Sequence, residues 1–274
     1  MIVKNNLPAT NTNRAHESTQ AAKAKSTEKL SSGNKINRGA DDAAGLAISE
    51  KMMRQIFALS KATANAQDGI SSIQTADGAL EQVDGMLNRM NELGVKAGNE
   101  TLGDEERYSI QAEMNALRSE VDRIAETTTF NDQKLLDGSF ADGKKLQVGS
   151  EAGSENQVNI AIAKMDWNSI SGNGSIGIGN RDQIATTLDS VKSAMESVAT
   201  MRSDMGATQN SLSSLVSNLR NATENTTAAY SSIRDTDMAS EMVNNSSKNI
   251  LARTQEAIQA QANQNSRNVL SLLN

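Results

Sequence analysis

Residues 59–97 read LSKATANAQDGISSIQTADGALEQVDGMLNRMNELGVKA, and this stretch decides the fold of the chain. Apolar or small residues recur along it at alternating steps of three and four positions: Leu59, Ala62, Ala66, Gly69, Ile73, Ala76, Leu80, Val83, Leu87, Met90, Gly94 and Ala97. Only an α-helix places residues with this spacing on one face, and a sustained period of this kind is typical of long helices that pack along one another. The stretch therefore predicts one long helix among other long helices.

The composition agrees with long helices. Pro8 is the single proline in 274 residues, so almost nothing interrupts a helix. Aromatic residues make up only 2%, which favours a slender coiled-coil bundle over a wide globular core. Cysteine is absent, which excludes disulfides and thiolate metal sites.

The charge and the hydropathy pattern argue against two kinds of partner. The formal net charge is −6, whereas nucleic acids and anionic membranes are bound by basic patches. No apolar run approaches the ~18–20 residues of a transmembrane helix, and the first residues lack the apolar centre of a cleaved signal peptide. We expect no nucleic-acid or membrane partner, and we expect any export to use a route without a cleaved signal peptide.

Helix signals divide the first half of the chain. Residues 1–32 are polar with weak periodicity, which indicates a marginal helix or a segment that orders on binding. Asp41 and Asp42 precede the long helix, where acceptors and negative charge stabilise a helix N-terminus, and the helix should end at Ala97. Asp104 opens a second helix, which should run antiparallel to the first because the connection is short.

The period changes to two in the middle of the chain. Apolar residues alternate at Leu146 and Val148 and again at Val158, Ile160 and Ile162, around a turn-rich segment, which predicts a β-hairpin. Helical spacing then returns, and a last segment from about residue 235 carries apolar residues that have no partner within its own length. The fold class predicted is mainly α, with long antiparallel coiled-coil helices and a small β-hairpin region.

Several motifs resemble bacterial flagellin, lie at both ends of the chain and follow the family's order. They are LSSG at 30–33, INR at 36–38, DDAAGLAI at 41–48, NAQDGIS at 65–71, QTADGAL at 74–80, AQANQ at 260–264 and NVLSLL at 268–273. The resemblance implies a structural subunit, and not an enzyme, that polymerises into the extracellular flagellar filament for motility. It implies no cofactor and no metal, and its expected partners are other copies of the chain, the flagellar export apparatus and an export chaperone.

The resemblance also implies a division of the chain. Residues 1–40 and 235–274 would pair as the N- and C-terminal helices of an inner filament core. Residues 41–181 would form the N-terminal long helices and the hairpin of an outer core, and residues 182–234 its C-terminal long helix. The assembly residues expected in the last segment are Leu251, Ile258, Val269, Leu270, Leu272 and Leu273.

A second surface follows from the same resemblance. Residues 87–93, LNRMNEL, are similar to the flagellin surface recognised by the flagellin-sensing Toll-like receptor of animal innate immunity. The receptor-binding residues implied are Leu87, Arg89, Met90, Glu92, Leu93 and Glu113. Without the family, Arg89, Glu92 and Glu113 are ordinary solvated positions on helix faces, and Leu93 is a packing position.

Other functions remain open from the residues. The hook–filament junction protein, another secreted coiled-coil rod such as a needle-complex component, or a soluble signalling ligand that never polymerises would also need long helices. Catalysis is the poorer interpretation, because His16 is the only histidine and neither a Ser/His/Asp triad nor an H-E-x-x-H zinc site is available. Asp41 and Asp42 are better placed to cap a helix than to act as paired catalytic carboxylates.

Overall fold

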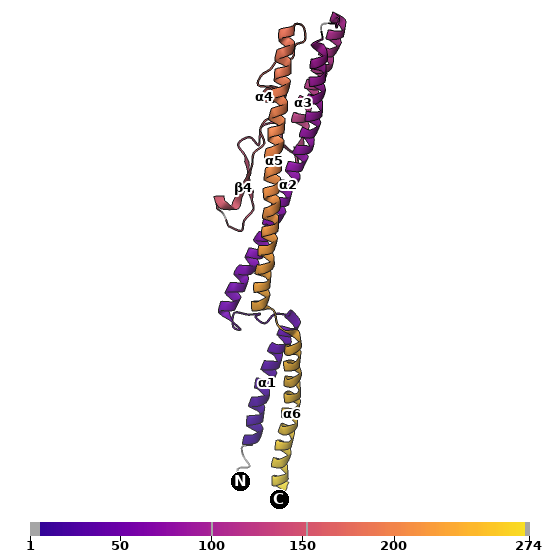
Figure 1. Cartoon of the computed structure of the whole chain (residues 1–274). Coiled ribbons are helices and arrows are strands. Elements are labelled where there is room, and N and C mark those ends of the chain that lie inside the picture. The colour runs from indigo at the N-terminus through magenta and orange to yellow at the C-terminus, as the bar shows by residue number, and fades with distance from the viewer. Residues whose placement is uncertain (1–5, 100, 152, 272–274) are drawn as a thin grey trace. The chain divides into compact units, whose positions relative to one another are not determined.

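The computed structural model describes residues 6–99, 101–151 and 153–271, and it divides into two compact units. The terminal unit comprises Met1–Ile56 and Glu224–Asn274, and the central unit comprises Phe57–Thr223. The structure is mainly helical, which confirms the predicted fold class (Figure 1). Among the described residues, no helix combines the length and the apolar character that crossing a membrane requires.

Five long helices contain most of the described chain. They are α1 (Leu7–Ser32), α2 (Ala43–Ala97), α3 (Asp104–Thr127), α5 (Arg181–Arg234) and α6 (Met238–Ser271), and α4 (Trp167–Ile170) is a single turn. The strands are β1 (Thr129–Phe130), β2 (Gln133–Lys134), β3 (Lys144–Gln147) and β4 (Gln157–Ile160), and a short 3-10 helix, η1 (Ser154–Asn156), precedes β4.

The ends of α2 and α3 follow from local hydrogen bonds. Asp42 Oδ1 accepts a hydrogen bond from the Gly45 backbone nitrogen over 2.9 Å, which confirms the predicted capping role for Asp42. The same prediction is wrong for Asp41, whose side chain accepts from the backbone nitrogens of Asn37 and Arg38 before the helix. The helix ends at Ala97, as the sequence predicts. At the start of α3, the Glu106 side chain accepts a hydrogen bond from the backbone nitrogen of Gly103, and three acidic residues occupy the first turn, where the helix dipole favours them.

The core of the central unit is built on the apolar stripe of α2. Every position of the stripe from Leu59 to Ala97 is buried. The facing side chains come from α3 (Ile110, Met114 and Val121) and from α5 (Val191, Val198, Met205 and Leu212). Gly94 lets α5 approach closely, since a Cβ at this position would lie 2.7 Å from Leu188 Cδ2.

Two small hairpins lie between α3 and α5. β3 and β4 pair antiparallel with Leu146 opposite Val158, which confirms the predicted hairpin. β1 and β2 form a second, unpredicted hairpin around Asn131 and Asp132, which have φ angles of 51° and 59°. Positive φ at both central residues is the geometry of a tight turn that matches the twist of antiparallel strands.

The single tryptophan anchors the segment that follows β4. Trp167 is completely buried, at 0% exposure. Its backbone nitrogen donates to Asp122 Oδ1 over 2.8 Å, and its indole nitrogen donates to the Gly174 carbonyl oxygen over 3.0 Å. These two bonds fix α4 against α3 and hold the loop between α4 and α5.

In the terminal unit, α1 and α6 lie side by side and antiparallel (Figure 1). The polar N-terminal segment that predicts only a marginal helix forms the 26 residues of α1. Asn6 caps this helix by accepting a hydrogen bond from the Ala9 backbone nitrogen. Pro8 lies in the first turn, where its missing N–H costs no helical hydrogen bond.

Candidate interaction surfaces

Polar side chains set the register of the α1–α6 pair. Ser26 Oγ donates to Glu241 Oε1 over 2.5 Å, and Gln255 Nε2 donates to Thr19 Oγ1 over 3.0 Å. Two further cross-helix bonds run from Asn245 Nδ2 to Thr27 Oγ1 and from Asn6 Nδ2 to the Ala262 carbonyl oxygen. Hydrogen bonds define the register of two helices, but each contributes only about 0.5–1.5 kcal/mol. These hydrogen bonds therefore set the register of the pair and contribute only modestly to its stability.

The outer face of α6 carries four large apolar side chains that the described residues of the chain leave exposed. Val243, Ile250, Leu251 and Ile258 are 66%, 65%, 52% and 52% exposed. Val243 and Ile258 lie seven or eight positions from the adjacent pair Ile250 and Leu251, which places all four on one side of the helix. We call this set the α6 apolar row.

The α6 apolar row contains two of the predicted assembly residues, Leu251 and Ile258. Four other predicted assembly residues lie outside the residues whose side chains the structure describes: Val269, Leu270, Leu272 and Leu273. Met238 and Met242 are also exposed at the start of α6, and the sequence prediction omitted them. Their four-residue spacing at the start of a helix was the signal for them.

The connector between α1 and α2, residues 33–42, is tied to both ends of the α5–α6 junction. Gly33 has φ 71°, a left-handed conformation that ends α1, and its backbone nitrogen donates to the Lys29 carbonyl oxygen. Its own carbonyl oxygen accepts a hydrogen bond from Thr236, and Lys35 N donates to the Arg234 carbonyl oxygen. Backbone hydrogen bonds therefore join the segment that follows α1 to the end of α5 and to the α5–α6 junction.

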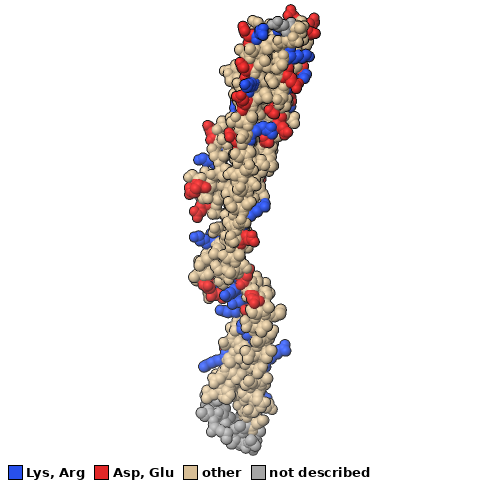
Figure 2. Space-filling view, viewed as in Figure 1, with Lys and Arg blue, Asp and Glu red and all other residues tan. Residues whose placement is uncertain are grey.

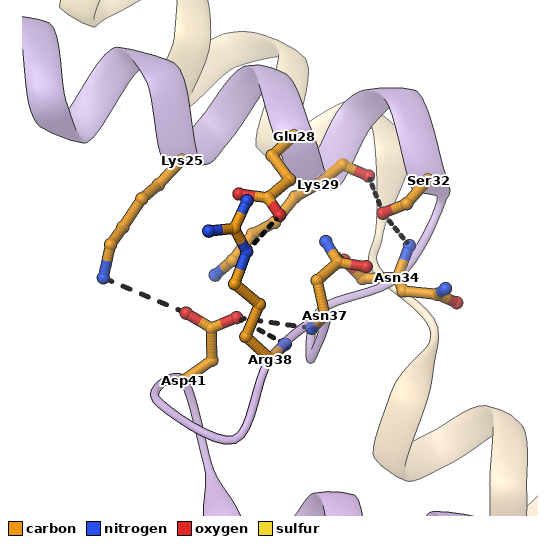
Figure 3. Close-up of polar contacts among 8 residues, drawn as sticks. All are labelled: Lys25, Glu28, Lys29, Ser32, Asn34, Asn37, Arg38 and Asp41. Atoms are coloured by element: carbon orange, nitrogen blue, oxygen red, sulfur yellow. Dashed lines mark hydrogen bonds and ion pairs between the residues drawn. The ribbon is translucent and has the colours of Figure 1, made fainter.

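Two acidic side chains hold the rest of the connector (Figure 3). Asp41 Oδ2 accepts hydrogen bonds from the backbone nitrogens of Arg38, over 3.1 Å, and Asn37, over 3.3 Å. These two N–H groups lower the pKa of Asp41, and the Lys25 ammonium 3.9 Å away adds to the effect. Arg38 Nε donates to Glu28 Oε1 over 2.9 Å, which ties the connector back to α1.

The predicted receptor-binding residues separate into two groups. Leu87, Met90 and Leu93 are buried in the core of the central unit, at 0%, 0% and 2% exposure. The interpretation of Leu93 as a packing position therefore agrees with the structure.

The charged members form an exposed ionic cluster between α2 and α3. Arg89 Nε and Nη2 both contact Glu113 Oε1, over 3.0 and 2.9 Å, and Arg89 Nη1 contacts Glu92 Oε2 over 3.1 Å. The hydrogen bonds that Arg89 donates to Glu113, and then to Glu92, raise the pKa of Arg89. Exposed pairs of this kind add little stability, and the cluster is available for contact with a partner.

Charges of both signs are interspersed over the visible face of the central unit (Figure 2). Asp and Glu outnumber Lys and Arg within residues 57–223. Within the parts of the chain that the structure describes, no group of three or more His, Cys, Asp or Glu side chains could hold a metal ion.

Two family models together match most of the chain. The bacterial flagellin N-terminal helical region matches residues 3–141, and the bacterial flagellin C-terminal helical region matches residues 188–273. The unmatched interval contains β3, β4, α4 and the start of α5. The chain belongs to the bacterial flagellin family.

Curated relatives agree with this family along their full length. A flagellin of Halalkalibacterium halodurans is 44% identical over 274 residues, and a flagellin of Bacillus subtilis is 43% identical over 303 residues. A flagellar filament 31.3 kDa core protein of Treponema maltophilum is 41% identical over 286 residues. Each alignment covers 100% of this chain and 100% of the relative.

Solved structures with low sequence identity share the fold. A putative flagellar hook-associated protein of Vibrio parahaemolyticus has a TM-score of 0.63 at 13% identity, covering 71% of this chain and 100% of that chain. Bacillus cereus flagellin has a TM-score of 0.50 at 24% identity, covering 57% of this chain and 88% of that chain. The long-helix architecture is therefore found in both kinds of flagellar protein.

Proposed function

We propose that this chain is the repeating subunit of an extracellular bacterial flagellar filament and serves motility. The single observation that carries the proposal is the uncovered α6 apolar row in a member of the flagellin family. α6 is already paired with α1 on its other side, so an exposed row of large apolar side chains on it indicates an interaction site for a further partner. In a filament, neighbouring copies of the same chain supply that partner.

The energetics favour many neighbours over one. Full burial of an aliphatic side chain contributes about 1.5–3 kcal/mol, so covering the exposed half or more of four side chains contributes about 4–8 kcal/mol. Bringing two chains together costs an estimated 4–15 kcal/mol in lost translational and rotational freedom. One such contact is marginal, whereas a subunit that contacts several neighbours in a polymer gains it repeatedly. The contact joins different surfaces of successive copies, which generates an open filament instead of a closed dimer.

The test is polymerisation of purified full-length chain, seeded with short filament fragments and followed by sedimentation and electron microscopy. Deletion of residues 236–274 should leave a soluble monomer that does not polymerise. Ile250→Asp with Ile258→Asp should also abolish polymerisation, because charge in the α6 apolar row cannot be buried between copies. Ile250→Val with Ile258→Val, which keeps the same two positions of the row apolar, is the matched control and should still polymerise.

Filaments from the deletion, or from the double variant, would disprove the proposed assembly contact. Full-length chain that stays monodisperse with seeds present would instead support a soluble ligand. The hook–filament junction protein is the remaining alternative, and a subunit that lengthens seeds without limit excludes it. Export through the flagellar apparatus with a dedicated chaperone is part of the same proposal.

We propose a second role for the exposed Arg89 cluster as a surface for the flagellin-sensing Toll-like receptor. The support is the exposure of Arg89, Glu92 and Glu113, which converge from α2 and α3. Arg89→Ala with Glu113→Ala should weaken binding to the receptor ectodomain. Arg123→Ala, which removes an exposed arginine paired with Glu120 on α3, is the control and should bind as the unchanged chain does. Equal binding by both variants would refute the role.

A further inference from the structure

The loop between α4 and α5 contains the one Asn-Gly pair of the sequence, Asn173 and Gly174. The side-chain amide of an asparagine can be attacked by the backbone nitrogen of the next residue. Glycine in the next position favours this reaction, because it has no Cβ to hinder the approach and its backbone is permissive. The local structure decides whether the two groups are free to meet.

Both reacting groups are loosely held. The Asn173 side chain is exposed and makes no hydrogen bond to another described residue. The Gly174 nitrogen donates to the Ser171 carbonyl oxygen over 3.3 Å, beyond the usual range for this kind of bond. Asn173 has φ 66°, a left-handed conformation that asparagine adopts more readily than most residues. The Asn173 side chain is therefore free to rotate, and one long hydrogen bond holds the attacking nitrogen. The backbone around them is fixed, since Asn173 N donates to the Asn168 carbonyl oxygen over 3.0 Å and the Gly174 carbonyl oxygen accepts from Trp167.

Related Asp-Gly pairs elsewhere in the chain are held differently. Asp142 is exposed, but the Gly143 nitrogen that follows it donates to the Phe140 carbonyl oxygen over 2.9 Å, a shorter bond than that of Gly174. Asp137 also precedes a glycine, but the Ser139 backbone nitrogen donates to its carboxylate over 2.9 Å. This hydrogen bond lowers the pKa of Asp137 and keeps the carboxylate ionised, and an ionised carboxylate is a poor electrophile. Asp68, Asp77 and Asp84 precede glycines inside α2, where helical geometry fixes the backbone.

Gly174 also attaches the loop to Trp167 and packs against α5. Its carbonyl oxygen accepts the hydrogen bond from the buried Trp167 indole over 3.0 Å. Its Cα faces α5 so closely that an added Cβ would lie 2.1 Å from Ser190 Oγ. A longer backbone immediately before Gly174 would move this carbonyl away from the indole and leave a buried donor without its acceptor.

We propose that Asn173 is a site of spontaneous deamidation and isomerisation, and that the isomerised product releases the loop from Trp167. The Gly174 nitrogen forms a bond to the Asn173 amide carbon, and the bond from that carbon to the amide nitrogen breaks. Ammonia leaves, carrying the proton that Gly174 loses. Water then opens the cyclic imide, adding hydroxyl to a carbonyl carbon and a proton to the ring nitrogen.

The two directions of ring opening give different products. Opening at the backbone carbonyl of residue 173 produces isoaspartate, in which one methylene lengthens the main chain. Opening at the side-chain carbonyl produces ordinary aspartate, which adds a charge and keeps the backbone length. Water is the only co-reactant, so the modification needs no enzyme and accumulates with the age of the subunit.

To test this, the purified full chain is incubated at mildly alkaline pH. A parallel sample is kept at mildly acidic pH, because imide formation is slow there. Peptide mapping by mass spectrometry should show conversion of the amide to an acid several-fold faster at Asn173 than at any other asparagine. Enzymatic methylation of isoaspartate should label the same peptide. Since Trp167 is the only tryptophan, its emission should shift to longer wavelength as isoaspartate accumulates.

Three variants serve as controls. Asn173→Gly removes the amide and suits the positive φ, so it should show neither the modification nor the emission shift. Asn173→Gln should behave in the same way, because ring closure from the longer side chain is slow. Asn180→Gln, an exposed asparagine of the same loop, should change neither signal. Faster conversion at another asparagine, or conversion at Asn173 with unchanged Trp167 emission, would overturn the proposal.

Discussion

Two glycines of α2 show how much a single residue depends on its surroundings. Gly78 is exposed, and an added Cβ would meet no atom within 4 Å, whereas a Cβ on Gly94 would lie 2.7 Å from Leu188 Cδ2. Alanine is better than glycine inside a helix by about 0.8–1 kcal/mol at either position. At Gly94 this gain is opposed by an overpacking cost of about 1–3 kcal/mol.

Opposite effects are therefore expected from the two alanine variants. Gly78→Ala should raise the free energy of unfolding of the central unit by about 0.5–1 kcal/mol, and Gly94→Ala should leave it unchanged or lower it by up to about 2 kcal/mol. Urea unfolding followed by far-UV circular dichroism measures both. A gain of the same size at both positions would contradict the close packing of α2 against α5.

The Asp41 carboxylate should make the connector sensitive to acid. Its pKa in the native state is lower than its ordinary value of about 3.9 because Arg38 and Asn37 donate backbone hydrogen bonds to it. The native state thus binds protons less readily than the unfolded state does. The stabilisation is fully present above the ordinary value and is lost as the pH falls through the lowered native pKa.

An NMR titration of the Asp41 carboxyl carbon measures this effect. Its midpoint should lie below that of a short unstructured peptide spanning residues 37–45. Asp41→Asn should remove this acid-dependent step and loosen the backbone of Arg38 at every pH. A midpoint at or above the peptide value would mean that the two backbone hydrogen bonds do not form.

At the scale of elements, the sequence predicted best those helices whose ends carry their own chemistry. α2 begins beside Asp42, α3 begins at Asp104, and both helices follow a strict apolar period. The sequence therefore predicted where each of the two helices starts. The β3–β4 hairpin was found because apolar residues alternate in both strands. Local signals of these kinds need no knowledge of distant contacts.

Elements that depend on a partner were predicted less well. α1 has weak periodicity because its buried side consists largely of polar residues that bond to α6, such as Ser26 with Glu241. The β1–β2 hairpin has strands of two residues each, too short to show a period. For the candidate surfaces, the sequence selected Leu251 and Ile258, and it separated solvated Arg89 from the packing position Leu93. It could not show that Arg89 and Glu113 converge, because the two residues lie on different helices.

The β1–β2 turn gives a prediction at this scale. Asp132 has φ 59°, a conformation in which glycine is unstrained and a β-branched residue is disfavoured. Asp132→Gly should raise the free energy of unfolding of the central unit by roughly 0.5–1 kcal/mol, and Asp132→Val should lower it by at least about 1 kcal/mol. Thermal unfolding of the two variants and of the unchanged chain measures these differences in the free energy of unfolding. Stabilisation by valine would show that the turn is not of the assigned type.

At the scale of the whole molecule, the two units differ in how much apolar surface each covers. The main core cluster runs from Ala66 to Val216 and lies entirely in the central unit. The terminal unit exposes most of its large apolar side chains along α6. Ordering a residue costs about 1–2 kcal/mol in backbone entropy, and burial in the terminal unit of a single chain offsets little of it.

Hydrogen exchange on the monomer should therefore show two levels of protection. Amides of α2 and α5 within the central unit should exchange slowly, and those of α1 and α6 should exchange quickly. Polymerisation should slow exchange in α1 and α6, because neighbouring copies would cover the α6 apolar row. Full protection of α1 and α6 in the monomer would contradict this account.

The β3–β4 hairpin should allow a longer segment to be inserted between its two strands. Gln147 pairs with Gln157, and Val148 N donates to the Asn156 carbonyl oxygen, so the two ends of the intervening segment are fixed next to each other. The entropy of closing a loop grows only with the logarithm of its length, about 1 kcal/mol for a fourfold longer loop. A foreign peptide grafted at this tip would thus be carried and displayed by helices that need no redesign, once in every copy.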